Sequence, residues 1–222
     1  MTSSWQAEKR EVVRAAQKMA ELGLVAATSG NVSMRLPEDG KRALIAITPS
    51  GTPYDALRDA DIVVVDFEVE PVEGDLAPSY ESLLHVAIYQ RRPDVGAVMH
   101  THAVYSSVAA VTGMEVPPIV DEMVVNLGGA VRVSEYAFPG TPELADNVCN
   151  ALGDRNAAII RNHGAVGVGR DLRAALDACA LTERVAQIFV LSSLMGKVGT
   201  LPKEVVEAEA AIFRMQRRSL PS

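Results

Sequence analysis

Short apolar runs joined by brief connections are the feature that most constrains the fold of this chain. Such runs are typical of β-strands, and a short connection between two of them favours antiparallel pairing. The expected strands lie at 32–36, 43–47, 62–67, 95–99, 157–160 and 165–168. We therefore expect a mainly antiparallel central sheet.

Segments with helical spacing lie before, between and after these runs. Gly23 ends the first of them, Thr141 followed by Pro142 begins another, and Asp171 begins a long one. The expected helices cover 5–22, 81–91, 103–111, a segment from 142, 171–195 and 203–217. Segments 117–125 and 130–133 are interpreted as strands and 71–78 as a loop. The whole pattern predicts one α/β domain over 1–222, with helices covering the sheet.

Composition narrows the function classes. At 222 residues the chain can bury one substantial core, while a net charge of −7 argues against a general nucleic-acid or anionic-membrane binder. No apolar run approaches the length of a membrane span, and the first ten residues have no signal-peptide core. Cys149 and Cys179 lie in helix-like stretches and are interpreted as buried thiols. We expect a cytoplasmic protein.

Three of the four histidines follow two of the apolar runs. His100 and His102 are two residues apart at the end of one run, so in an extended strand their side chains share a face. His163 stands at the end of a neighbouring run. Three imidazoles can hold a catalytic metal ion with one open position. The competing interpretation is three buried histidines with hydrogen-bond partners.

Glu81 begins the helix that precedes the His100 strand. A carboxylate near a metal ion can be a ligand or an acid/base. The competing interpretation is a first-turn glutamate stabilised by the helix dipole. His85 lies one turn further on the same face, and we predict a structural role for it.

Three loops are rich in small hydrogen-bond donors. Glycine lets backbone N–H groups approach an anion, and serine, threonine and asparagine add side-chain donors. The loops are residues 28–31, 48–51 and 78–79. Each alone is more often a plain turn. Beside a metal site, they predict a phosphate clamp for one end of a substrate.

Five short motifs occur in a characteristic order: SGNVS at 29–33, TPSG at 48–51, PSYE at 78–81, HTH at 100–102 and NHG at 162–164. In this order the chain resembles the class II aldolases of the L-fuculose-phosphate aldolase type, over roughly residues 12–190. That family also contains ribulose-phosphate 4-epimerases and methylthioribulose-phosphate dehydratases. The resemblance implies a three-layer sandwich, with the antiparallel sheet between two helix layers.

The resemblance also implies the members of the site. It assigns Zn²⁺, with Mn²⁺ or Co²⁺ as alternatives, to His100, His102 and His163, with Glu81 nearby as ligand and catalytic residue. The implied phosphate site consists of Gly30, Asn31, Ser50, Gly51 and Ser79. Members of the family are commonly homotetramers with active sites between subunits, so a homotetramer is expected here.

The implied reaction is aldol cleavage of a ketose 1-phosphate to dihydroxyacetone phosphate and an aldehyde, with Glu81 returning a proton to the enediolate. The candidate substrates are the 1-phosphates of L-fuculose, 5-deoxyribulose and methylthioribulose. The alternatives are a 4-epimerase or a dehydratase on the same fold, and a non-catalytic adducin-like module. A non-catalytic module should have lost the metal histidines, which are all present.

Two positions depart from the aldolase pattern. Tyr80 replaces a serine that would donate to phosphate, and Glu122 takes the place of a tyrosine that reaches a neighbouring subunit's site. Both changes weaken the case for fuculose as the substrate. Glu122 is either an acid/base at the neighbour's site or an ordinary interface carboxylate.

Overall fold

The apolar runs form one sheet in the computed structural model, which describes residues 5–37 and 42–218. In these residues the sheet has seven strands in the order β4-β3-β2-β1-β5-β7-β6, and every neighbouring pair is antiparallel. The strands are β1 (Asn31–Arg35), β2 (Leu44–Ile47), β3 (Val63–Asp66), β4 (Pro71–Glu73), β5 (Ala97–Thr101), β6 (Ala157–Ile160) and β7 (Gly164–Gly169). The predicted antiparallel sheet is confirmed.

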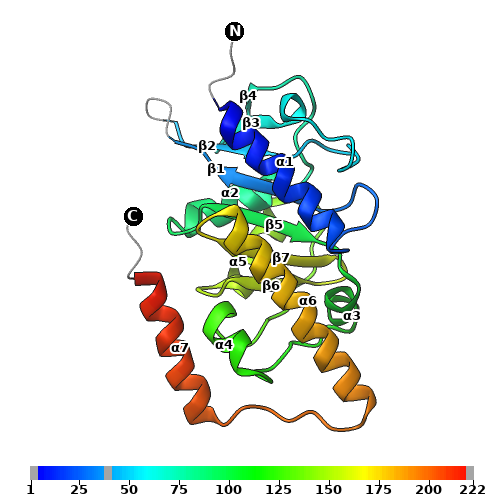
Figure 1. Ribbon diagram of the computed structural model, residues 1–222, viewed down its shortest axis with the longest axis vertical. Coiled ribbons are helices and arrows are strands. Elements are labelled where there is room, and N and C mark those ends of the chain that lie inside the picture. The colour runs from blue at the N-terminus through cyan, green and yellow to red at the C-terminus, as the bar shows by residue number, and fades with distance from the viewer. Residues whose placement is uncertain (1–4, 38–41, 219–222) are drawn as a thin grey trace.

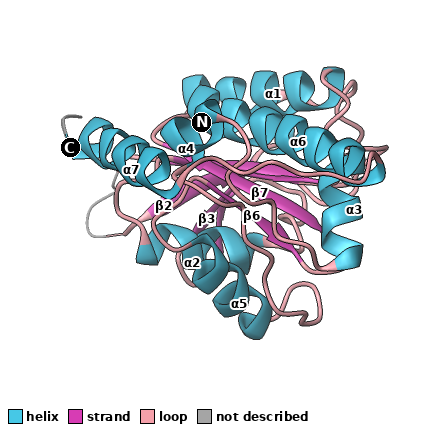
Figure 2. Cartoon of the chain, turned by 90° about the horizontal axis from the view of Figure 1, so that it is seen from below, coloured by secondary structure: helices cyan, strands magenta, loops and turns pink. Residues whose placement is uncertain are grey.

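Helices cover both faces of the sheet. Helices α1 and α6 pack on one face, and α2 and α5 pack on the other (Figure 2). The helices are α1 (Gln6–Glu21), α2 (Ser82–Arg91), α3 (Val104–Thr112), α4 (Asp121–Leu127), α5 (Pro142–Leu152), α6 (Leu172–Leu194) and α7 (Lys203–Arg218). A 3-10 turn, η1 (Asp59–Asp61), precedes β3. The arrangement is the expected three-layer sandwich.

Local side-chain caps explain where two helices begin. The Thr141 hydroxyl accepts a hydrogen bond from the Leu144 N–H, and the Asp171 carboxylate accepts one from the Ala174 N–H. Each bond satisfies an N–H group that a helix start otherwise leaves without a partner. Both caps were predicted from the sequence.

Helix α6, which follows the last strand, packs across β5 and β7. Helix α7, near the C-terminus, packs beside α4 (Figure 1).

The prediction of a strand at 117–125 was wrong, because Asp121–Leu127 forms α4. Two acidic residues in the first turn favour a helix, and Gly128 ends it in the left-handed conformation. Met123, Val124 and Leu127 then face the core at helical spacing. The β-branched residues around this segment suggested a strand, but the helix-end signals and this burial pattern outweighed that preference.

Two further segments differ from the structure predicted for them. Pro71–Glu73, predicted as part of a loop, is the edge strand β4 and pairs with β3. Segment 130–133 forms no named strand, and Val131 and Val133 make only isolated bridges to Val116 and Ile159.

Cys149 and Cys179 are buried free thiols, as expected. Among the described residues no helix combines the length and apolarity needed to cross a membrane.

Candidate active site

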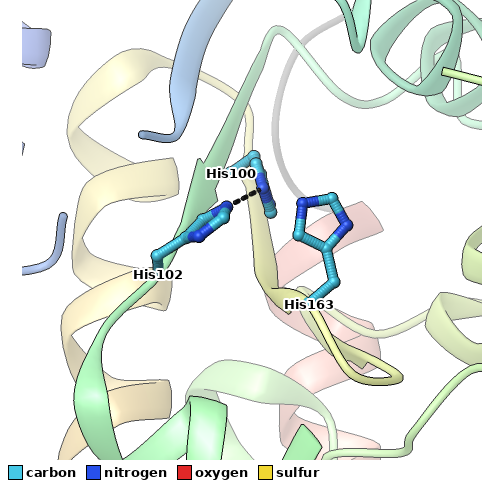
Figure 3. A group of neighbouring side chains, drawn as sticks. All are labelled: His100, His102 and His163. Atoms are coloured by element: carbon cyan, nitrogen blue, oxygen red, sulfur yellow. Dashed lines mark hydrogen bonds between the residues drawn. The ribbon is translucent and has the colours of Figure 1, made fainter. Parts of the chain in front are cut away.

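Three histidine side chains meet where β5 ends beside the β6–β7 turn. His100 is in β5, His102 lies just beyond it, and His163 is in the turn. Their rings face one another (Figure 3), with centroids 4.6, 4.7 and 4.9 Å apart. One possible ligand atom from each ring lies within 4.8 Å of the others. The predicted cluster forms, and its geometry can hold a metal ion.

A hydrogen bond from Nδ1 of His100 to the backbone orients the other ring nitrogen, Nε2, toward the histidine cluster. Nδ1 lies 3.0 Å from the backbone oxygen of Ala165, so in the neutral ring Nδ1–H donates and Nε2 carries a lone pair. That Nε2 lies 2.7 Å from Nε2 of His102. Without a metal ion this contact is a hydrogen bond from His102 Nε2–H, and loss of that proton would leave two lone pairs directed at one point, as metal binding requires.

Gly164 allows the turn that carries His163 to approach the other two histidines. A Cβ atom at this position would lie 2.2 Å from the Thr101 backbone oxygen. It would also press on the rings of His100 and His102, at 3.2 and 3.3 Å. The NHG motif therefore has a steric basis, since any larger residue would separate the turn from β5.

Glu81 lies over the histidine cluster from the start of α2. Its Oε2 is 3.1 Å from His100 Nε2, and its Oε1 is 3.5 Å from His163 Nε2. Oε1 is buried and has no hydrogen-bond partner. Because the neutral His100 presents a lone pair, two acceptors face each other there unless a proton or a cation lies between them. These residues therefore fit a divalent metal ion.

Burial lowers the pKa values of His102 and His163, which favours the neutral form that binds metal. Desolvation, together with the charges of its two neighbours, lowers the pKa of His102 to about 4, and burial also lowers the pKa of His163. Burial raises the pKa of Glu81, but the charges of His100 and His163 and a hydrogen bond from Asn31 outweigh it and lower that pKa. At neutral pH these shifts favour neutral imidazoles at His102 and His163 and a carboxylate at Glu81.

Asn31 connects the first donor loop to Glu81. Its side-chain Nδ2 lies 2.8 Å from Glu81 Oε2, and its Oδ1 accepts from His85 Nε2 at 2.5 Å. His85 is fully buried and continues into further polar contacts. The sequence placed His85 on the same helix face as Glu81, but its role was predicted to be structural. The missing signal was the pairing of β1 with β5, which brings Asn31 opposite His100.

Backbone hydrogen bonds join the donor loops at the end of β1 nearest Glu81. The Ser50 N–H donates to the Ala77 oxygen at 3.0 Å, and the Ser79 N–H donates to the Thr48 oxygen at 3.2 Å. The Thr48 hydroxyl in turn accepts from the Val32 N–H. Loops distant in the sequence are thus neighbours, as a shared anion site would require.

The predicted phosphate residues differ in how freely they can bind a ligand. Ser50 and Gly51 are exposed, whereas Ser79 is buried and its hydroxyl accepts the Glu81 N–H at 3.3 Å. Gly30 is in the left-handed conformation, with the His100 backbone oxygen in the space that a Cβ would occupy. The Asn31 carboxamide has one N–H committed to Glu81 and a second left for a ligand.

The two departures from the aldolase pattern lie on the surface. Tyr80 is 83% exposed beside Ser79, and Glu122 pairs with Arg184 of α6 at 3.1 Å. Glu122 is therefore not part of the histidine cluster within this chain. Any catalytic role for it would be at another subunit.

Comparison with known proteins places this chain in a family. The model for the class II aldolase and adducin N-terminal domain matches residues 10–190. A 5-deoxy-D-ribulose 1-phosphate aldolase of Bacillus thuringiensis serovar kurstaki is 33% identical, over 94% of this chain and 96% of its own length. A 5-methylthioribulose-1-phosphate/5-deoxyribulose-1-phosphate aldolase of Rhodospirillum rubrum is 35% identical, over 96% and 94%. A solved L-fuculose 1-phosphate aldolase is 36% identical with a TM-score of 0.88, covering 96% of this chain and 98% of that one.

Proposed function

The chain belongs to the class II aldolase and adducin family, and we propose that it is a metal-dependent aldolase that cleaves a deoxyketose 1-phosphate. The observation that carries this proposal is the buried Glu81 carboxylate over three converging imidazoles, with one oxygen unpartnered. Most buried acceptors in a structural cluster have a hydrogen-bond partner, so an unpartnered carboxylate oxygen beside three imidazoles points to a further ligand. An acid/base beside a metal ion requires a free one.

We propose Zn²⁺ as the metal, with Mn²⁺ or Co²⁺ as alternatives, held by His100, His102 and His163. Three imidazoles suit zinc, whose catalytic sites keep a fourth position for substrate. When bound, the metal supplies Lewis-acid chemistry that polarises a carbonyl oxygen of the ketose. Glu81, directly over the three imidazoles, would be a further ligand or an acid/base beside the metal.

The protein's own residues then divide the remaining work. Gly30, Asn31, Ser50, Gly51 and Ser79 are proposed to hold the phosphate with backbone and side-chain donors. A base removes the C4 hydroxyl proton as the C3–C4 bond breaks, which releases the aldehyde and leaves the electron pair on C3. Glu81 takes up one proton at Oε1, the oxygen that no other group binds, and delivers it to that carbon, so that it returns to the carboxylate.

We propose 5-deoxyribulose 1-phosphate or 5-methylthioribulose 1-phosphate as the substrate, ahead of L-fuculose 1-phosphate. Relatives that match nearly the full chain carry the first two names, but the solved L-fuculose 1-phosphate aldolase matches as fully, so the ranking rests on the two departures. Tyr80 and Glu122 are the departures that favour an aldehyde other than lactaldehyde. We also propose a homotetramer in the cytoplasm, where sugar phosphates are retained, and Glu122 as a candidate acid/base at the neighbouring subunit.

A coupled assay for dihydroxyacetone phosphate tests the reaction. Zinc-loaded protein is offered each of the three ketose 1-phosphates beside a chelator-treated sample. Metal-dependent release of triose phosphate is expected. A product of unchanged mass would instead indicate the 4-epimerase, and a product lighter by one water the dehydratase. No product from any candidate, with one zinc bound per chain, would refute the proposal.

A further inference from the structure

A line of buried polar side chains runs from the core to Glu81 between β1 and α2. The Tyr89 hydroxyl lies 2.8 Å from Ser33 Oγ, which lies 2.7 Å from His85 Nδ1. His85 Nε2 contacts Asn31 Oδ1, and Asn31 Nδ2 contacts Glu81 Oε2 at 2.8 Å. Tyr89, Ser33 and His85 are almost completely inaccessible to solvent. We call these side chains the Glu81 relay.

The carboxylate end of the Glu81 relay fixes the direction of the hydrogen bonds next to it. A carboxylate can only accept, so the Asn31 amide nitrogen faces Glu81 and its oxygen faces His85. At the other end, either the Tyr89 or the Ser33 hydroxyl can be the donor of the bond between them.

His85 therefore carries a proton on Nε2, and the ring is neutral when the Ser33 hydroxyl donates to Nδ1. That nitrogen donates to Asn31 Oδ1, while Nδ1 accepts from the Ser33 hydroxyl. Complete burial agrees with this state, since desolvation lowers the pKa of His85 to about 3. With the other tautomer, Nδ1–H would meet the Ser33 hydroxyl and a bare Nε2 would face the Asn31 oxygen, so two acceptors would oppose each other.

We propose that His85 is a positioning residue for Glu81: as the Nε2–H tautomer it orients the Asn31 carboxamide, whose N–H holds Glu81 Oε2 and leaves Oε1 directed at the histidine cluster. His85 touches neither metal nor substrate. It acts by selecting one orientation of Asn31 and, through it, one rotamer of Glu81. The inference rests on the proposed function only for what Glu81 does once positioned.

Two substitutions of the same residue separate positioning from packing. Glutamine places an amide N–H near the position of Nε2, so His85→Gln keeps the bond to Asn31 and loses the bond from Ser33. Asparagine places its oxygen near the position of Nδ1, so His85→Asn keeps the Ser33 bond and loses the bond to Asn31. Both leave part of the imidazole volume empty, so both are destabilised, the shorter asparagine more so.

Positioning predicts unequal kinetics for the two variants. His85→Asn should lower kcat about 10- to 100-fold with KM changed by no more than about twofold, as for other residues that act through a neighbour. His85→Gln should keep kcat within about threefold of the unchanged protein. Both should bind one zinc ion per chain, because the three metal histidines are untouched. Equal kcat values for the two folded variants would overturn the proposal.

The tautomer itself is measurable without any variant or substrate. Long-range ¹H–¹⁵N correlation of the metal-free protein should show one neutral histidine with its proton on Nε2, whose signals change little when zinc is added. The other three of the chain's four histidines should shift, which identifies His85. A proton on Nδ1, or a charged ring, would refute the Glu81 relay. An inactive but correctly tautomeric wild-type protein would refute the proposed aldolase function alone.

Discussion

Glu81 Oε1 faces His163 Nε2 across 3.5 Å and has no hydrogen-bond partner, although it is buried. The same carboxylate has its other oxygen held by Asn31. The two oxygens are therefore unequal: one is anchored, and the other is available for chemistry. This asymmetry connects the fold to the proposed reaction.

Glu81→Gln tests the use of the free oxygen. The amide keeps the shape of the side chain but cannot exchange a proton, so kcat should fall by about 100-fold or more. Zinc content should remain near one ion per chain if Glu81 is mainly an acid/base, and this is measured by elemental analysis beside the coupled assay. Wild-type kcat in this variant would exclude Glu81 from the chemistry.

Removing the metal should cost stability as well as activity. A ligand that binds only the folded chain raises the free energy of unfolding by about 2.7 kcal/mol when its concentration is 100 times its Kd. Chelator-treated protein should therefore unfold at lower urea concentration than the zinc-loaded protein. His163→Ala should remove most of this difference, whereas it should persist in a control such as Arg173→Ala on exposed α6 surface.

The sheet and the histidine cluster were predictable because local patterns encode them. His100 and His102 share a strand end, so their convergence needs only the period of a strand. Thr141 and Asp171 each stand immediately before a helix and cap its first turn with their own side chains. Segment 121–127 is harder to predict, because its β-branched residues favour a strand while its acidic first turn and Gly128 favour the helix α4 that forms.

The polar surroundings of Glu81 were not predictable in the same way. Asn31 and Ser33 are two residues apart on β1, and His85 and Tyr89 are four apart on α2, so each pair shares a face. Nothing local says that these two faces meet. That contact follows from packing α2 across β1, which pairs with β5. The sequence shows only that His85 stands among apolar residues of a helical stretch, which does not identify its partners.

Acid should destabilise the metal-free protein through His85. The pKa of this histidine is depressed from 6.5 to about 3 by burial, so the unfolded chain takes up a proton that the folded chain excludes. This stabilising contribution is complete above pH 6.5 and is lost as pH falls toward 3. The free energy of unfolding should drop by up to about 1.4 kcal/mol per pH unit for this one group.

Urea titrations of chelated protein at several pH values between 7 and 4 measure this slope. His85→Gln removes the titrating ring, so its curve should be shallower than that of the wild type. His102 and His163 still contribute below pH 6.5, because burial lowers both of their pKa values. Parallel curves for the two proteins would show that His85 is protonated as easily when folded as when unfolded.

Glu183 should support the metal site from α6. Its two carboxylate oxygens each lie 2.8 Å from a backbone nitrogen at the start of α3, those of Tyr105 and Ser106. This helix begins two residues after His102, and its own N-cap residue provides no side-chain cap. Glu183→Ala should cost about 1–2 kcal/mol in urea unfolding and weaken zinc binding. Glu183→Gln, which keeps an acceptor, should cost less; equal losses would show that the hydrogen bonds are unimportant.

Gly30 and Gly23 form a matched pair for testing how closely the first donor loop is fitted to the metal site. Both have positive φ, +75° and +69°, so alanine is strained by about 1–2 kcal/mol at either position. A Cβ on Gly23 would meet nothing within 4 Å, whereas a Cβ on Gly30 would lie 2.6 Å from the His100 backbone oxygen. Gly23→Ala should therefore show the conformational cost alone, with zinc affinity and kcat unchanged. Gly30→Ala should lose more stability in urea and also weaken zinc binding, because the Cβ would press on the Val25 side chain and on β5 at His100, both at 2.6 Å. Equal effects at the two positions would mean that the loop yields instead of the strand.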